Sequence, residues 1–192
     1  MDKITLKEWK ELANSNPEKL FVEKGAESYI PLMAKLDIIE LAVHNHETEV
    51  DGKTYTVPPM CIDIDENGYA TINPISKLLF LMQIYLSLYF NVSIGDAKFS
   101  TSEYDDIIRH GYQSKINRLE SKASTPKIKW AVINQQNDFK AFEKLLNKEL
   151  ADEIARLNDP YRRIMERIEA EITPERVKQA TEELKQLTSR KA

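Results

Sequence analysis

Glycine is scarce in this sequence, and its scarcity excludes a large group of nucleotide-binding sites. The chain of 192 residues contains five glycines, all well separated from one another. Phosphate-binding loops need closely spaced glycines, because only glycine lets the backbone approach a phosphate so closely. The sequence also lacks the Gly-x-Ser-x-Gly, His-Glu-x-x-His and Cys-x-x-Cys motifs. We therefore expect a protein that is not an enzyme and that uses no cofactor.

Cysteine is almost absent, which excludes stabilisation by internal disulfides. The single thiol belongs to Cys61, and a lone thiol suits a reducing cytoplasm. A nucleophilic cysteine needs a helix N-terminus or a basic pocket to lower its pKa. Cys61 is instead followed by a segment in which isoleucine alternates with aspartate. We predict an inert, buried thiol.

Long hydrophobic segments are also lacking. The most apolar segment, residues 75–90, contains Lys77 and Gln83, and it is shorter than the ~20 residues that a membrane-spanning helix needs. The N-terminus has no basic segment followed by an apolar one, so we expect no signal peptide. We predict that residues 75–90 form a buried core helix and that the protein has no membrane partner.

Charge is plentiful but unevenly distributed. Apolar residues make up 42% of the chain and charged residues 30%, which is typical of a globular protein, and the net charge is −4. Residues 1–114 carry 18 acidic and 10 basic residues, whereas residues 115–192 carry 13 acidic and 17 basic residues. The two parts could attract each other, either within one chain or between neighbouring copies.

Residues 1–120 are predicted to form a helical domain. A capping box from Thr5 to Glu8 begins a short helix, whose Trp9 is expected to pack either on the protein's own core or on a partner. Residues 28–44 have apolar side chains at helical spacing, with Pro31 in the first turn, where a missing N–H costs nothing. The predicted caps of the later helices in this domain are Asn73, Ser100 with Glu103, and Gly111.

A β-hairpin insertion is predicted within this domain at about residues 47–72. Asp51-Gly52 supplies the positive φ angles that a type I′ turn requires, and the residues on both sides are typical of strands. Asn67-Gly68 marks a second turn. We expect a small antiparallel sheet here.

Residues 127–192 are predicted to form a helical C-terminal region, which follows a polar segment broken by Pro126. Asp159-Pro160 and Thr173-Pro174 are each typical of a new helix start. Each predicted helix has one apolar face, which must pack on another helix, on the first domain or on another chain. The fold class is therefore mainly α with a small antiparallel β-hairpin insertion (α+β) and a helical C-terminal extension. The predicted protein interface comprises Trp9, Trp130, Tyr161, Ile164, Ile168, Leu184 and Leu187.

Two segments contain residue types that bind metals. Residues 63–71 match the first nine positions of a calcium loop, but Pro74 occupies the twelfth position, at which such a loop has a bidentate glutamate. A turn rich in Asp, Asn and Gly explains the same residues. His44 and His46 could bind zinc if they lay on a strand, whereas a helix C-terminus also favours histidine. In both segments the structural explanation is preferred, so no metal site is predicted.

Basic and aromatic residues occur together twice, at Lys127–Trp130 and at Tyr161–Arg163. One interpretation is phosphate contact with base stacking, and the other is an amphipathic surface with partly buried aromatic rings. Acidic residues nearby would repel phosphate, which argues against nucleic acid as a partner. These acidic residues are Asp138, Glu143, Glu149, Asp152 and Glu153.

Four features in residues 29–115 carry a resemblance to a known group of proteins. They are a helix start at Tyr29–Leu32, the Asn67-Gly68 turn, an apolar helix at Leu78–Phe90 and a helix at Tyr104–Gly111. Together they resemble small virion-associated proteins of tailed bacteriophages, over less than half of the chain. The resemblance implies a structural part of a particle, such as a head–tail connector or neck component, present in many copies. It also implies location in the virion, and in the host cytoplasm during assembly.

Three functions therefore compete on the sequence alone. The first is a non-catalytic assembly protein of a bacteriophage particle, whose partners are other virion proteins and copies of itself. The second is a small regulator or inhibitor that binds one host protein. The third is a metal-dependent enzyme that uses Asp63 and Asp65 or His44 and His46. No small-molecule substrate is inferred.

Overall fold

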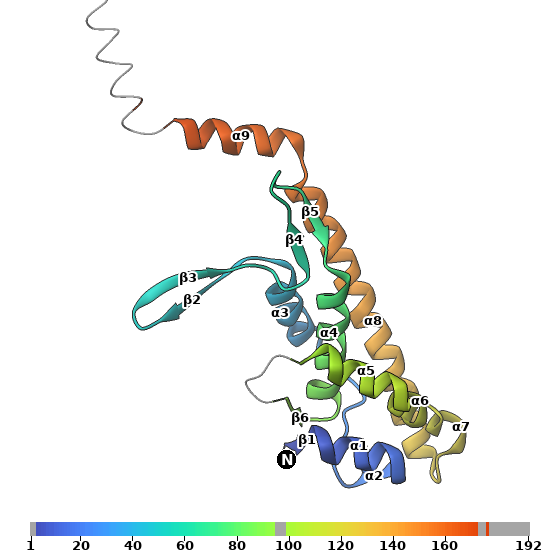
Figure 1. Cartoon of the computed structure of the whole chain (residues 1–192). Coiled ribbons are helices and arrows are strands. Elements are labelled where there is room, and N and C mark those ends of the chain that lie inside the picture. The colour runs from blue at the N-terminus through green and yellow to red at the C-terminus, as the bar shows by residue number, and fades with distance from the viewer. Residues whose placement is uncertain (1–2, 95–98, 173–175, 177–192) are drawn as a thin grey trace, which may run out of the picture.

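The structure is a computed structural model, which describes residues 3–94, 99–172 and 176 (Figure 1). Helices predominate and the strands are short, so the predicted mainly α fold with a small antiparallel β component is confirmed. The helices are α1 (Leu6–Ser15), α2 (Glu18–Val22), α3 (Leu32–Val43), α4 (Pro74–Ile84), the π-helix η1 (Tyr85–Tyr89), α5 (Thr101–His110), α6 (Tyr112–Asn117), α7 (Leu119–Lys122), α8 (Pro126–Leu157) and α9 (Pro160–Glu171). The strands are β1 (Ile4–Thr5), β2 (His46–Val50), β3 (Lys53–Val57), β4 (Ile62–Ile64), β5 (Ala70–Ile72) and β6 (Val92–Ser93).

Most of the helices begin at the residues that the sequence predicted. A side-chain oxygen accepts a hydrogen bond from a backbone N–H of the first turn in α1, α4, α5 and α9. Only one half of the predicted capping box at Thr5 is formed: the Thr5 hydroxyl accepts a hydrogen bond from the Glu8 N–H. The Glu8 carboxylate lies 2.5 Å from Lys24 Nζ instead. The prediction that α3 begins at Ser28 was wrong: the helix starts after Pro31, since a proline disfavours helical geometry at the residue before it. The capping residues are Thr5, Asn73, Ser100 and Asp159.

The strands form three separate two-stranded pairs in the described part of the chain, not one small sheet. The hairpin β2–β3 has the predicted type I′ turn, with φ values of 51° at Asp51 and 71° at Gly52. The second hairpin, β4–β5, forms around the Asn67-Gly68 turn. The parallel pair β1–β6 was not predicted, because it joins segments that are almost ninety residues apart, with Ile4 opposite Val92.

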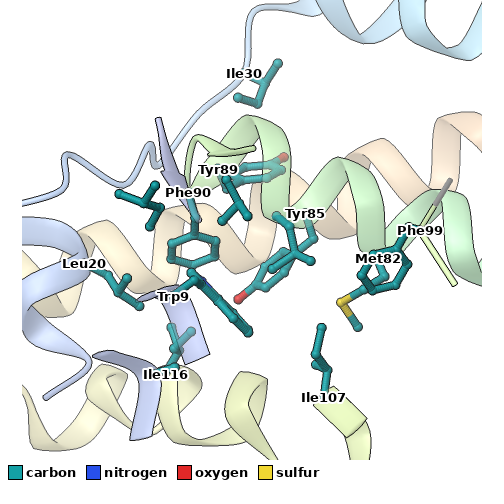
Figure 2. Packing of buried hydrophobic residues seen from close by; sticks show 14 residues of the cluster. Trp9, Leu20, Ile30, Met82, Tyr85, Tyr89, Phe90, Phe99, Ile107 and Ile116 are labelled. Carbon is teal, nitrogen blue, oxygen red and sulfur yellow. The ribbon is translucent and has the colours of Figure 1, made fainter. Parts of the chain in front are cut away.

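The first hydrophobic cluster surrounds Trp9, which has no exposed surface (Figure 2). Its ring makes edge-to-face contacts with Phe90, at 5.8 Å between ring centroids, and with Tyr112, at 5.9 Å. Such contacts contribute to stability beyond the area that they bury. The core helix predicted at residues 75–90 is therefore present, although its second half is the π-helix η1.

The second hydrophobic cluster joins α8 to the first part of the chain. Phe142, Leu146 and Leu150 of α8 are fully buried against residues of α3, α4 and the β4–β5 hairpin. The segment between residues 120 and 127, where the domain boundary was predicted, contains the end of α7, the turn that follows it and the start of α8. Because α8 shares a core with the preceding residues, its apolar stripe packs within its own chain.

A buried polar contact between α3, η1 and α8 reinforces this core. Asp138 accepts hydrogen bonds from Lys35 Nζ at 2.5 Å, from the Tyr89 hydroxyl at 2.8 Å and from the Ile30 N–H at 2.9 Å. Nearby, Gln135 Nε2 donates to the Glu27 carbonyl oxygen at 2.7 Å. The prediction that Asp138 is a surface charge that would repel phosphate was wrong, because its side chain is only 9% exposed.

Candidate protein interface

Helix α9 presents an apolar stripe that no described residue covers. Its apolar residues are spaced three and four apart, so they share one face of the helix. In Figure 1, α9 turns away from the end of α8 and stands clear of the body. The exposed residues of the stripe are Tyr161, Ile164, Met165, Ile168 and Ile172. An amphipathic helix whose apolar face lies in water is a candidate binding surface.

The direction of α9 is set by contacts at its base. Asn158, which ends α8, makes two hydrogen bonds of 2.8 Å with the backbone of Ala70 in β5. The Arg163 guanidinium lies 4.1 Å from the centre of the Tyr69 ring and donates a hydrogen bond to the Asn67 carbonyl oxygen. The β4–β5 hairpin therefore holds the first turn of α9 and leaves the apolar stripe uncovered.

The hairpin β2–β3 is a second projecting element. Figure 1 shows it extending away from the helices, and every residue from Glu47 to Val57 is at least partly exposed. A two-stranded hairpin buries too little surface to be stable alone, and its outer strand edges can pair with another strand. Val50 and Tyr55 add exposed apolar surface. These properties are typical of an element that is completed by a partner.

The predicted interface residues fall into three groups. Trp130, Tyr161, Ile164 and Ile168 are exposed, with 62% of Trp130 accessible. Trp9 is a core residue and must be removed from the interface, because α1 packs its apolar face on Phe90 and Tyr112. Two further predicted interface residues, Leu184 and Leu187, lie outside the described residues.

Exposed apolar residues of α3 and α4 were not among the predicted interface residues, because residues 75–90 were predicted to form a buried core helix and residues 28–44 were predicted only to be helical. Both helices are apolar around most of their circumference, and that pattern is the signal that could have indicated an outer contact face. The side chains concerned are Leu32, Met33, Leu36, Leu41, Ile75 and Leu78.

Of the residues considered for metal binding, Asp63, Asp65 and His44 make structural contacts. Asp65 accepts hydrogen bonds from the N–H groups of Asn67, at 2.9 Å, and Tyr69, at 2.8 Å, as in an Asx turn. His44 caps the end of α3 with Glu153 3.4 Å away, and His46 lies in β2. Among the residues that the structure describes, no three His, Cys, Asp or Glu side chains lie close enough to share a metal ion.

Cys61 is fully buried, as predicted. Burial raises the pKa of its thiol to about 11, against a smaller opposing effect of the Lys77 charge. Because the thiolate is the nucleophilic form, this environment opposes reaction at neutral pH.

In the described part of the chain, no helix combines the length and apolarity that crossing a membrane requires.

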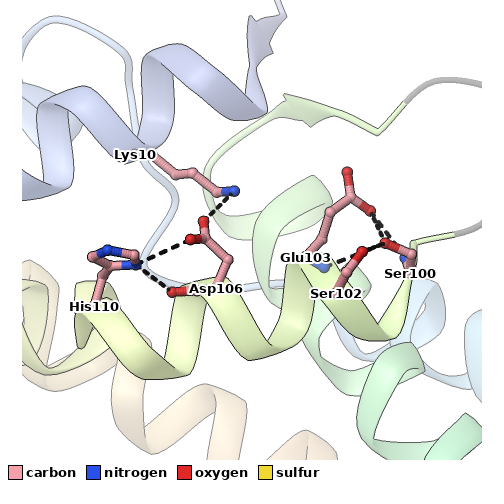
Figure 3. A network of polar contacts seen from close by, with 6 residues as sticks. All are labelled: Lys10, Ser100, Ser102, Glu103, Asp106 and His110. Carbon is pink, nitrogen blue, oxygen red and sulfur yellow. Dashed lines mark hydrogen bonds and ion pairs between the residues drawn. The ribbon is translucent and has the colours of Figure 1, made fainter.

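A cluster of polar residues that contains a His–Asp pair links two helices (Figure 3). His110 Nδ1 lies 3.0 Å from Asp106 Oδ1, and Lys10 Nζ lies 2.6 Å from the other carboxylate oxygen. The hydrogen bond from Lys10 lowers the pKa of the Asp106 carboxyl. The serines drawn in Figure 3 lie at the start of α5, where Ser100 forms the capping box with Glu103. The cluster thus ties α5 to α1.

No protein-family model, curated protein or solved structure matches the chain significantly.

Proposed function

We propose that the protein is a non-catalytic assembly protein that binds copies of itself and other proteins of a larger particle. The observation that carries this proposal is the α9 stripe, which leaves Ile164 and Ile168 56% and 44% exposed on a helix held away from the core. Exposed apolar stripes of this kind are costly in water unless a partner covers them. The hairpin β2–β3 supports the same interpretation, because it too is an element that lacks its own core.

The particle we propose is a tailed bacteriophage, with the protein in the head–tail connector or neck region. This part of the proposal rests on the resemblance within residues 29–115. The architecture supports it in one respect. A firmly packed body with contact elements on different sides suits a subunit that touches several neighbours at once.

The mass of the protein in solution tests the proposal. A chain of 22.2 kDa that assembles should give a larger mass by light scattering at micromolar concentration. Replacing two stripe residues together, Ile164→Glu and Ile168→Glu, should lower that mass, because burying two carboxylates opposes association. The matched control is Ala151→Glu with Ala155→Glu, which places the same charges at the same spacing on the exposed surface of α8.

The outcomes separate the competing functions. A reduced mass in the stripe variant alone supports assembly through α9. A wild-type mass that stays at 22.2 kDa at all concentrations contradicts self-association, and a regulator that binds a single host protein would then become the better explanation. Thermal stabilisation by millimolar calcium or stoichiometric zinc would instead favour a metal-dependent protein.

A further inference from the structure

Two patches of opposite charge lie on the surface of this chain. The acidic patch covers the outer side of α3 and the hairpin β2–β3, where Lys53 is the one basic residue among five exposed carboxylates. The basic patch covers α6, α7 and the start of α8, together with the preceding Arg109. Glu120 is the one acidic residue within these elements, and the Glu18 carboxylate of α2 reaches the patch, where it accepts hydrogen bonds from Ser124. The acidic patch comprises Asp37, Glu40, Glu47, Glu49 and Asp51. The basic patch comprises Arg109, Lys115, Arg118, Lys122, Lys127 and Lys129.

The two patches lie on opposite sides of the molecule. In Figure 1 the hairpin extends to the left of the body formed by α3, α4 and α8, whereas α6 and α7 lie at the lower right. The patches are thus separated by the core and cannot neutralise each other within one chain. Two different surfaces on opposite sides are what a head-to-tail contact between identical subunits requires.

Both patches are largely free of internal ion pairs. Within the described part of the chain, none of the five carboxylates of the acidic patch forms a salt bridge. The same holds for Arg118, Lys122, Lys127 and Lys129 of the basic patch. By contrast, the Lys10–Asp106 and Lys24–Glu8 pairs elsewhere on the surface are closed at 2.6 and 2.5 Å.

The secondary structure of each patch determines which of its side chains face outward together. Side chains alternate along a strand, so Glu47 and Glu49 lie on the same face of the hairpin, opposite the neutral Thr56 and Thr54. The basic patch offers a groove of about 400 Å³ between α6, α7 and α8, and Gln136 Nε2 is buried there without an acceptor. The groove is lined by Ser114, Asn117, Arg118, Glu120, Ser121 and Gln136.

Of the two basic residues at the start of α8, Lys129 lies on the side of the groove, because it precedes Gln136 by two helical turns and so shares its face. Lys127 and Trp130 lie on the other side of the helix and are not part of this contact.

We propose that the hairpin β2–β3 of one copy docks on the basic patch of the next copy, with its carboxylates facing Arg118, Lys122 and Lys129. This inference rests on the proposed function, because it assumes that copies associate. The contact is heterologous, so each subunit keeps one hairpin and one basic patch available, and the contacts propagate until a ring closes or a filament grows. The α9 stripe is then left for a different neighbour.

Charge reversal on either patch, followed by mixing, tests the inference. The first variant combines Glu40→Lys, Glu47→Lys and Glu49→Lys. The second combines Arg118→Glu, Lys122→Glu and Lys129→Glu. Each variant alone would face like charges across the contact and should associate at least about tenfold more weakly than the wild type in sedimentation velocity. An equimolar mixture should recover the wild-type mass, because each hairpin then meets a patch of opposite sign.

The mixture also controls for folding, since a misfolded variant could not restore association. Raising salt from about 50 mM to about 500 mM should dissolve the wild-type contact, because exposed charges are screened. The inference is overturned, and the proposed function retained, if both variants keep the wild-type mass. A wild type that stays monomeric overturns both proposals. If the second variant keeps its mass but loses a DNA mobility shift that the wild type shows, the basic patch binds nucleic acid instead.

Discussion

The two tryptophans of this chain lie in opposite environments. Trp9 is fully buried between Phe90 and Tyr112, whereas Trp130 is 62% exposed. Both lie on helices with apolar neighbours, so composition alone does not separate them. The difference is the helix face: Trp9 belongs to the face of α1 that packs on the core, whereas Trp130 lies almost opposite Ile128, the residue through which α8 packs on α7.

The same contrast extends to whole regions of the molecule. The body is held by two apolar clusters and by a polar contact at Asp138 in which every partner is buried. The hairpin β2–β3 and helix α9 project from it, and α9 is held at its base mainly by Asn158 and Arg163. A region packed in this way supplies stability, and a region that exposes its apolar residues supplies contacts. Substitutions should therefore separate folding from assembly.

Replacing the buried tryptophan should have the largest effect. Trp9→Ala should lower the free energy of unfolding by about 4 kcal/mol, because it removes a large ring and leaves a cavity beside Phe90. Trp130→Ala is the matched control and should change the same quantity by less than about 0.5 kcal/mol. Urea unfolding followed by circular dichroism measures both. Equal losses in the two variants would contradict the division into a packed body and a contact surface.

Removing the carboxylate at the centre of the buried polar contact should have the next largest effect. Asp138→Ala should cost about 3 kcal/mol in urea unfolding, because the Lys35 ammonium would stay buried without a counter-charge. Lys140→Ala, on the exposed side of the same helix, controls for the loss of a charge from α8.

A double substitution tests whether the unpaired Lys35 ammonium causes this loss of stability. Adding Lys35→Met to an Asp138→Leu variant removes both charges and should recover part of the stability, since an apolar pair can replace a buried ion pair. If Asp138→Leu alone were as stable as the double variant, the buried ammonium would not be the source of the cost.

The buried thiol predicts a pH dependence that belongs to the body alone. The unfolded chain loses the Cys61 proton at its ordinary pKa of about 8.5, whereas the folded chain keeps it until about pH 11. The unfolded state therefore binds fewer protons between these values, and the free energy of unfolding falls as pH rises. From about pH 8 to about pH 10, the wild type should lose about 2 kcal/mol more than Cys61→Ala.

Burial also raises the pKa of Tyr85 and of Tyr89, whose effects have the same sign at higher pH. Both tyrosines remain in the Cys61→Ala variant, so the difference between the two proteins isolates the thiol. Parallel pH profiles for the two proteins would mean that the thiol ionises as readily in the folded chain as in the unfolded one.

Interactions between residues close together in the sequence could be predicted, whereas those between distant residues could not. Caps at Asn73 and Ser100 and the Asp51-Gly52 turn depend on residues within one or two turns, so local patterns predicted them. The stripe of α9 was also predicted, since its spacing is a local property. The partners of Asp138 are separated from it by 49 to 108 residues, and no local pattern distinguishes a buried aspartate from a solvated one.

The smallest expected effect is that of replacing either of two glycines that have similar positive φ angles. Gly111 ends α5 within the body at a φ of 61°, and Gly52 lies at the hairpin tip at a φ of 71°; a Cβ at either position would meet no atom within 4 Å. Alanine should therefore cost about 1 kcal/mol locally at both sites through backbone strain alone. Gly111→Ala should lower the global free energy of unfolding by that amount. Gly52→Ala should leave it unchanged within about 0.5 kcal/mol, because the hairpin can open while the core stays folded.

Hydrogen exchange measures the local loss of hairpin stability, which urea unfolding of the whole protein does not detect. In Gly52→Ala, amides of residues 46–57 should exchange about fivefold faster, since 1 kcal/mol changes a local opening equilibrium by about that factor, whereas amides of α8 should keep their wild-type rates. The two sites are matched in φ and in free space, so a difference between them can only reflect how each element is coupled to the core. An equal global loss in both variants would mean that the hairpin unfolds together with the body. The hairpin would then be a part of the packed region, and its use as a separate contact element would lose its physical basis.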